Sequence, residues 1–181
     1  MKLTWTTLFA ALLMLPGSAP AQEATREVSN ITGDVYLFRN NSHNSVFIIT
    51  AEGVVVTDPI NAAAAAWLKS EIGKLTDRPI THLVYSHSHG DHASGGAEFG
   101  DVPNVIAHEN APEAIDGVVI GQRFSEEMQF SLGGKTFELT WLGPGHGVDL
   151  AAMVIRPENV AFVVDAVASR RLFYRDFGNA N

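Results

Sequence analysis

Apolar residues along this chain occur in short runs that polar or glycine-containing segments separate, which is typical of strands. Runs of this kind in the first part of the chain predict strands at residues 35–39, 46–50, 54–57, 80–85 and 105–107. The second and third of these strands are joined by the turn Ala51-Glu52-Gly53. Between the third and fourth, an alanine-rich segment predicts a helix from its N-cap Asn61 to about Leu75. The strand at 80–85 is mainly apolar, which predicts burial on both faces.

The second part of the chain repeats the strand pattern without a long helical segment. Further strands are predicted at residues 128–131, 135–142, 151–155 and 159–164, with short helical turns at 95–99 and 111–115. These later strands predict a second sheet. Sheets inside and helices outside define an α/β protein built in layers.

The loop after the strand at 80–85 reads Ser86-His87-Ser88-His89-Gly90-Asp91-His92 and holds three of the chain's seven histidines. Imidazole and carboxylate groups are ligands that zinc and iron take up in proteins. In extended backbone, residues two apart point to the same side, so His87 and His89 can bind one ion together. We expect Gly90 to turn the chain through backbone angles that other residues avoid, directing Asp91 and His92 to a second position nearby.

Two later segments offer further ligands. His146 lies in the loop Gly143-Pro144-Gly145-His146-Gly147, a tight turn after a predicted strand, and is the natural third ligand beside His87 and His89. Asp165 follows the strand predicted at 159–164, at the carboxyl end where open α/β sheets bind ligands, although aspartate is also a common turn residue. His82 is interpreted as structural, and His108 remains open between a structural role and the pocket.

These motifs, in this order, resemble the metallo-β-lactamase superfamily, and the segment Val54-Val55-Val56-Thr57-Asp58 resembles the early strand of that family that ends in aspartate. The resemblance implies a four-layer αβ/βα sandwich. A narrower similarity links the segments around residues 41–49, 57–61 and 83–87 to exported bacterial metallo-hydrolases, some of them associated with quinoprotein or sulfur-oxidation systems.

The resemblance also implies roles for single residues. His87, His89 and His146 are expected to bind a first metal, and Asp91 and His92 a second, with Asp165 bridging. Asp91 is also the expected catalytic residue, Asp58 is expected to support the ligands from behind, and His43 and Asn44 are candidates for substrate contact or for simple turn residues. The family brings one further histidine to the second metal from beyond the bridging aspartate. No histidine follows Asp165 in this sequence, so we expect a chain truncated at its C-terminus that lacks part of its second half, with a short variant as the alternative.

The ligand set predicts hydrolytic chemistry. Three neutral imidazoles leave zinc with an open position at which bound water can supply hydroxide near neutral pH. We therefore expect a zinc hydrolase, with one or two ions, acting on an ester, thioester or amide-type small molecule; iron or manganese is the alternative metal. A β-lactamase, a mononuclear iron dioxygenase of the same fold and a metal-binding fragment without turnover are the alternative functions. The absence of cysteine excludes ligand sets that use a thiolate.

The N-terminus and the overall charge bear on location and partners. Lys2, the apolar segment 8–15 and the small residues 19–21 resemble a signal peptide cleaved before Gln22, which predicts a periplasmic or secreted protein without stable membrane insertion and a mature domain from residue 22 to 181. A retained N-terminal anchor is the alternative. A net charge of −8 argues against a general nucleic-acid-binding role, so a small molecule is the expected partner.

Overall fold

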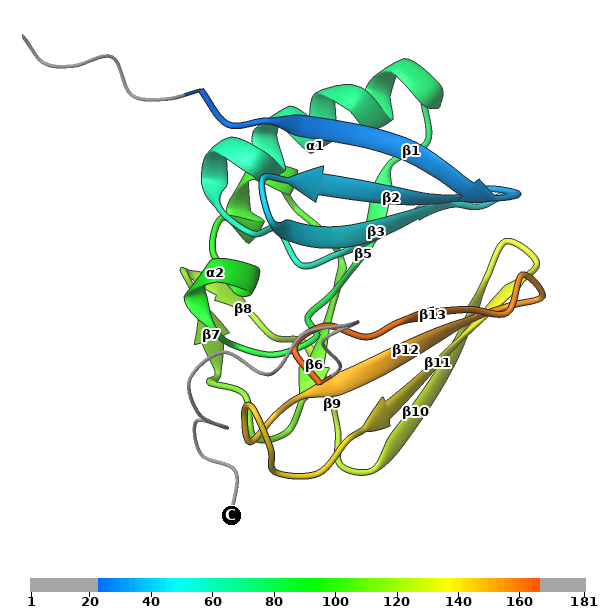
Figure 1. The fold of residues 1–181 in the computed structure, drawn as a ribbon. Coiled ribbons are helices and arrows are strands. Elements are labelled where there is room, and N and C mark those ends of the chain that lie inside the picture. Colours follow the sequence, from blue (N-terminus) through cyan, green and yellow to red (C-terminus); the bar gives the residue numbers. More distant parts are fainter. Residues whose placement is uncertain (1–22, 167–181) are drawn as a thin grey trace, which may run out of the picture.

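A computed structural model describes residues 23–166, and the predicted signal peptide lies outside this part of the chain (Figure 1). The larger sheet has seven strands in the order β1-β2-β3-β4-β5-β6-β9, and the smaller one has four in the order β10-β11-β12-β13. The strands of the larger sheet are β1 (Arg26–Thr32), β2 (Val35–Asn40), β3 (His43–Ile49), β4 (Val54–Thr57), β5 (Ile80–Val84), β6 (Asn104–His108) and β9 (Gln122–Phe124). The smaller sheet contains β10 (Glu127–Leu132), β11 (Lys135–Trp141), β12 (Ala151–Arg156) and β13 (Val160–Phe162).

Strand direction decides where the loops with chemistry meet. The first four strands of the larger sheet are antiparallel neighbours, whereas β4, β5, β6 and β9 run parallel. Parallel strands place their carboxyl ends at one edge of the sheet. Asp58 follows β4 and the histidine loop follows β5, so both lie at that edge.

The crossover between β4 and β5 is helix α1 (Ala62–Leu75), as the sequence predicts. Asn61 is its N-cap: its side-chain oxygen accepts a hydrogen bond from the backbone N–H of Ala64 at 3.0 Å. The helix turns Ala64, Ala65, Leu68 and Ile72 into the core. It forms a layer over one face of the larger sheet (Figure 1).

The larger sheet is buried on both faces because two hydrophobic cores meet across it. In β4, Val54 and Val56 pack into the core beneath α1, whereas Val55 packs into the core between the two sheets. The second sheet supplies Phe137, Met153 and Ile155 to this shared core. The described layers are therefore α1, the larger sheet and the smaller sheet, an α/β sandwich. Among residues 23–166, no helix covers the outer face of the smaller sheet.

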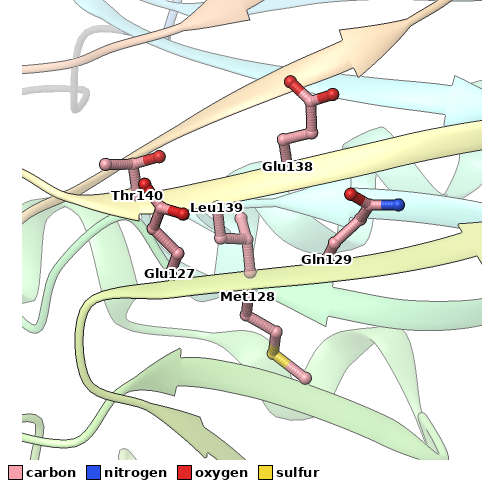
Figure 2. A pocket seen from close by; sticks show the side chains of 6 residues that line it. All are labelled: Glu127, Met128, Gln129, Glu138, Leu139 and Thr140. Atoms are coloured by element: carbon pink, nitrogen blue, oxygen red, sulfur yellow. The ribbon is translucent and has the colours of Figure 1, made fainter.

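That outer face is largely polar and carries a shallow depression between β10 and β11 (Figure 2). Its lining residues are Glu127, Met128, Gln129, Glu138, Leu139 and Thr140. Figure 2 shows Glu138 and Gln129 on the two neighbouring strands, which pair at this position. The depression is lined by carboxylates but by no histidine, so it is not the metal site that the histidine motif predicts.

No helix within residues 23–166 is long and apolar enough to cross a bilayer.

Several predictions about local structure need correction. The helical turn predicted at 111–115 is wrong: β7 (Ala114–Ile115) pairs with β8 (Val118–Val119) in a small hairpin. Asp116 and Gly117, both at positive φ, form its turn, as Asp-Gly pairs favour. The strand predicted at 159–164 is shorter and ends at Phe162, so Asp165 lies three residues beyond it in a left-handed conformation with φ 56°.

Gly90 does not supply the predicted special turn. It begins the single-turn helix α2 (Gly90–Ala93), and its φ is not positive. The chain changes direction because it enters this helix after the extended residue His89. The predicted turn at 95–99 is confirmed as the 3-10 helix η1 (Gly96–Phe99). Strands β1 and β9 were not predicted.

Candidate metal centre

Five of the seven histidines gather at the edge where β4 and β5 end. His87, His89 and His146 each offer a ring nitrogen within 4.8 Å of the other two. Nδ1 of His89 lies 2.9 Å from Nε2 of His146, and the ring centroids of His87 and His89 are 4.6 Å apart. Two ligands of a tetrahedral zinc ion are about 3.3 Å apart when each bond is about 2.05 Å. The structure thus brings together the three predicted ligands of a first metal.

Asp165 lies at the centre of the cluster. Its Oδ2 is 3.2 Å from Nε2 of His146 and from Nε2 of His92, and 3.6 Å from Nε2 of His87. One carboxylate oxygen therefore faces histidines of both predicted metal positions. This is the geometry expected of a bridging ligand.

The second predicted position contains Asp91 and His92, and the structure adds His43. Oδ2 of Asp91 lies 3.2 Å from Nε2 of His43, and the rings of His43 and His92 meet edge to face with centroids 5.4 Å apart. These three side chains form a second group with ligand atoms within 4.8 Å of one another.

Asp58 supports both groups from behind. It is fully buried; Oδ1 accepts the backbone N–H of Ser86 at 2.8 Å, and Oδ2 accepts the Ser86 hydroxyl at 2.6 Å and Nδ1–H of His92 at 3.2 Å. Because the Ser86 hydroxyl donates to Asp58, its oxygen is left to accept Nδ1–H of His87 at 3.0 Å. Asp58 thus fixes the ring of His92 directly and that of His87 through Ser86. In both rings the other nitrogen, Nε2, faces Asp165.

The residues present fit a metal ion. Nε2 of His87 is buried and has no hydrogen-bond partner within the described residues, which is costly unless something else binds it. Burial lowers the pKa of His87 to about 4, so its ring is neutral at pH 7 and its lone pair is free. An imidazole held through its second nitrogen is the usual form of a metal-binding histidine. The fit to a metal ion rests on these donors.

His92 has the opposite electrostatic environment. Burial alone would lower its pKa, but hydrogen bonds to Asp165 and Asp58 raise it to about 10. The same hydrogen bond from His92 lowers the pKa of Asp165 to about 2. In the metal-free protein at neutral pH, His92 is therefore a cation between two carboxylates, and an ion that binds Nε2 must displace a proton.

These shifts predict a stability maximum near pH 6.5 for the metal-free protein. Below pH 6.5 the unfolded chain protonates His87 while the folded chain does not until about pH 4, so the free energy of unfolding falls as the pH decreases, by on the order of 2–3 kcal/mol. Above pH 6.5 the folded chain keeps the proton on His92 that the unfolded chain loses, so stability falls again toward pH 10. Urea unfolding in EDTA between pH 4.5 and 9 measures both effects. His87→Asn should reduce the loss of stability below pH 6.5, and the lowered pKa of half-buried His82 accounts for part of the loss that is left. An unchanged loss of stability in this variant would contradict the assignment.

The loop that carries His146 is held at both ends. The backbone N–H of Leu142 donates to the carbonyl of Leu150 at 2.9 Å, and the Trp141 indole donates to the carbonyl of Val148 at 3.1 Å. Ala151, the first residue of β12, donates its backbone N–H to the carbonyl of Ser86 at 2.8 Å. The loop from the smaller sheet is therefore tied directly to the histidine loop of the larger one.

Three residues that the sequence analysis discussed lie apart from the cluster. Asn44 is exposed, and its side chain contacts Arg39 at 3.4 Å. His82 stacks on Phe130 of the smaller sheet with centroids 4.8 Å apart, in agreement with a structural role. His108 is buried; Nε2 donates to the carbonyl of Ser125 at 2.7 Å and Nδ1 accepts from Asn110, so both ring nitrogens are used.

Two residues of the site were not identified from the sequence as part of it. Ser86 was named only as part of the histidine loop, and its position directly before His87 was the signal for its supporting role. Asp149 is buried close behind the His146 loop: a Cβ added at Gly147 would lie 3.2 Å from Asp149 Oδ1 and 3.9 Å from His89 Nε2. Nothing in the sequence distinguishes this aspartate from a turn residue.

Comparison with known proteins identifies the family. The family model described as the metallo-beta-lactamase superfamily matches residues 39–180, a segment that contains all the residues of the cluster. The chain belongs to this superfamily. Among solved structures, the metallo-beta-lactamase IND-7 is 23% identical with a TM-score of 0.73, covering 89% of this chain and 80% of that one. A metallo-beta-lactamase from Pontibacter korlensis is 21% identical with a TM-score of 0.68, covering 76% of this chain and 70% of that one.

Curated relatives of this superfamily member carry other names. The 2,4-dinitroanisole O-demethylase subunit alpha of a Nocardioides strain is 25% identical over 86% of this chain and 51% of its own length. The thioesterase pkgB of Emericella nidulans is 31% identical over 58% of this chain and 30% of its own length. The chain thus spans about half or less of the length of these relatives, and they differ in the reactions that their names state.

Proposed function

We propose that this superfamily member is a zinc-dependent hydrolase that acts on an ester, thioester or amide-type small molecule. The observation that carries the proposal is the position of Asp165 Oδ2, within 3.6 Å of a ring nitrogen on each of three histidines, His87, His92 and His146. Structural zinc sites use four protein ligands, whereas catalytic sites bind zinc through three and leave the fourth position to water or substrate. His87, His89 and His146 supply three such ligands. A zinc ion bound there would lower the pKa of coordinated water and would polarise a carbonyl oxygen.

The chain's own residues account for the rest of the chemistry. Asp91 has a side chain 60% exposed, so it can reach solvent and substrate. Burial raises the pKa of Asp91, but the hydrogen bond from His43, a backbone hydrogen bond and the charges of His92 and His43 together lower it by more, and the carboxylate is ionised at neutral pH. We assign Asp91 the role of orienting the attacking water and accepting its proton.

The choice of substrate class rests on the ligand set and the relatives. The chain has no cysteine and no serine nucleophile is needed, because water is the nucleophile. The relative named a thioesterase supports an ester or thioester. Three alternative functions are kept. The fold supports a β-lactamase, a different reaction class is an iron-dependent dioxygenase, and the third is a metal-binding protein without turnover. The demethylase name adds an aryl methyl ether to the compounds worth testing.

We also propose that the protein is exported to the periplasm or secreted. The support is the pattern of residues 1–21, with a positive start, a short apolar segment and small residues before Gln22. N-terminal sequencing of the protein recovered from a bacterial periplasmic fraction tests this proposal, and an intact N-terminus in the cytosolic fraction would contradict it.

The catalytic proposal is tested by metal content and turnover of the 181-residue chain. The substrates are a chromogenic β-lactam, a glutathione thioester, an aryl ester and 2,4-dinitroanisole, each assayed with zinc and with iron. We expect stoichiometric zinc and hydrolysis of the ester or thioester without oxygen uptake. His89→Ala should lose both metal and turnover, and His82→Asn is the control that removes a histidine outside the cluster. Turnover that survives in His89→Ala would overturn the proposal.

A further inference from the structure

We propose that His43 is a ligand of the second metal ion, completing with Asp91 and His92 a set that Asp165 shares with the first site. This inference rests on the proposed metal-dependent function and deepens it. From the sequence, His43 was expected to contact substrate or to be a simple turn residue. The structure places Nε2 of His43 3.2 Å from Asp91 Oδ2, and places both within 4.8 Å of a ring nitrogen of His92.

The three groups have the chemistry of a zinc site. Two imidazoles and two carboxylate oxygens, those of Asp91 and Asp165, are ligands that zinc accepts in a four-coordinate arrangement. Nδ1 of His92 is tied to Asp58, which leaves Nε2 facing Asp165 at 3.2 Å. Asp58 also approaches His87 and His92, but its two oxygens already accept three hydrogen bonds and its side chain is fully buried. We therefore assign Asp58 an orienting role and His43 the ligand role.

The backbone around His43 is held in place. His43 is the first residue of β3 and pairs with Asn40 across the two-residue turn Asn41-Ser42. Asn41 has φ 55°, a left-handed conformation that asparagine tolerates better than most residues. The turn is fastened to the segment before β1: the backbone N–H of Asn41 donates to the carbonyl of Thr25 at 2.8 Å, and the Asn41 side chain accepts the Thr25 N–H at 2.9 Å. A ligand on this turn is therefore positioned before an ion arrives, which favours binding.

The neighbouring residue shows that the placement is specific. Successive side chains of a strand point to opposite faces, so the histidine and Asn44 diverge. Asn44 is exposed and contacts Arg39, whereas the His43 side chain is only 32% exposed and lies against Asp91 and His92. Asn44→Ala is thus the matched control for a change at position 43.

The test is zinc binding, measured independently of turnover. The 181-residue chain is dialysed at defined free zinc, bound metal is counted by mass spectrometry, and the two affinities are obtained by competition with a chromophoric chelator. The visible spectrum of the cobalt-substituted protein reports the coordination of each ion. We expect two ions in the unchanged protein and in Asn44→Ala.

His43→Ala and His43→Asn should keep the first ion with unchanged affinity and bind the second at least about 100-fold more weakly. Loss of a residue that only hydrogen-bonds to a ligand already lowers metal affinity about 10–100-fold, and loss of a ligand should lower it by more. His43→Asn separates the roles: its amide can still hydrogen-bond to Asp91 but is a poor zinc ligand. If it bound two ions normally, His43 would be only a hydrogen-bond partner and the proposal would be wrong. One ion in the unchanged protein would also overturn it while leaving the first site intact. Failure to bind any zinc would instead refute the proposed function.

Discussion

Replacing His146 by alanine is expected to lower kcat/KM by about 10³-fold or more and to remove the first metal ion. His146 comes from the smaller sheet, whereas His87 and His89 come from the larger one. Its loss leaves two imidazoles, and Nε2 of His146 is also one of the atoms that faces Asp165 at 3.2 Å. A 10³-fold loss corresponds to about 4 kcal/mol of transition-state stabilisation, the size expected when a metal's contribution is removed. Steady-state kinetics with the best substrate of the panel and metal analysis measure the effect.

The control for His146→Ala is His82→Asn. His82 stacks on Phe130 and contacts Thr81, so its substitution tests whether loss of any histidine disturbs the protein. We expect this variant to keep its zinc and its turnover. Circular dichroism of both variants checks that they fold. A folded His146→Ala variant with normal zinc content and kcat/KM would contradict the assignment of His146 as a ligand.

Replacing Asp58 by asparagine is expected to weaken zinc binding by about 10–100-fold although Asp58 itself is not assigned as a ligand. Oδ2 of Asp58 accepts hydrogen bonds from the Ser86 hydroxyl and from Nδ1–H of His92. In the variant an amide N–H, itself a hydrogen-bond donor, would face the Ser86 hydroxyl and His92 Nδ1–H, or the asparagine side chain would have to rotate. His92 would then lose its fixed ring orientation, and His87 would lose the support that Ser86 transmits. Chelator competition at pH 7 measures the two zinc affinities.

A second carboxyl group, outside the metal cluster, separates ligand orientation from fold stability in this experiment. Glu158 is half-buried in the turn after β12 and pairs with Lys135 of β11. Glu158→Gln should lower the thermal stability of the protein without changing the zinc affinities. If Asp58→Asn also left the zinc affinities unchanged, the supporting role of Asp58 would be refuted.

Much of the fold was predictable because its signals are local. The alternation of apolar segments and turns predicted β2 to β6 and β10 to β12 nearly at their observed positions, and the N-cap Asn61 marked the start of α1. The errors have physical causes. Strand β1 has mixed polarity because much of it is exposed, so it lacks a clear apolar pattern. Asp116-Gly117 was a turn signal that went unused, and β9 is too short to show a period.

The candidate site was predictable where chemistry is concentrated in the sequence. His87, His89, Asp91 and His92 lie within one loop, and His146 lies in a glycine-rich turn. The metal roles of these residues and of Asp165 stay predictions, although the structure brings all of them together. The place of His43 in the second group was not predictable, because it depends on how a hairpin turn packs against a loop almost fifty residues away. Contacts between residues so far apart in the sequence produce no local pattern of apolar and polar residues from which they could be predicted.

Anomalous diffraction at the zinc edge from crystals grown with zinc tests the central claim most directly. We predict a peak about 2.0–2.1 Å from Nε2 of His87, Nδ1 of His89 and Nε2 of His146. A peak at this position would show that imidazoles from both sheets bind one ion. Zinc found only elsewhere, or a His146 ring turned away from the other two, would contradict the proposed metal centre and the hydrolytic function built on it.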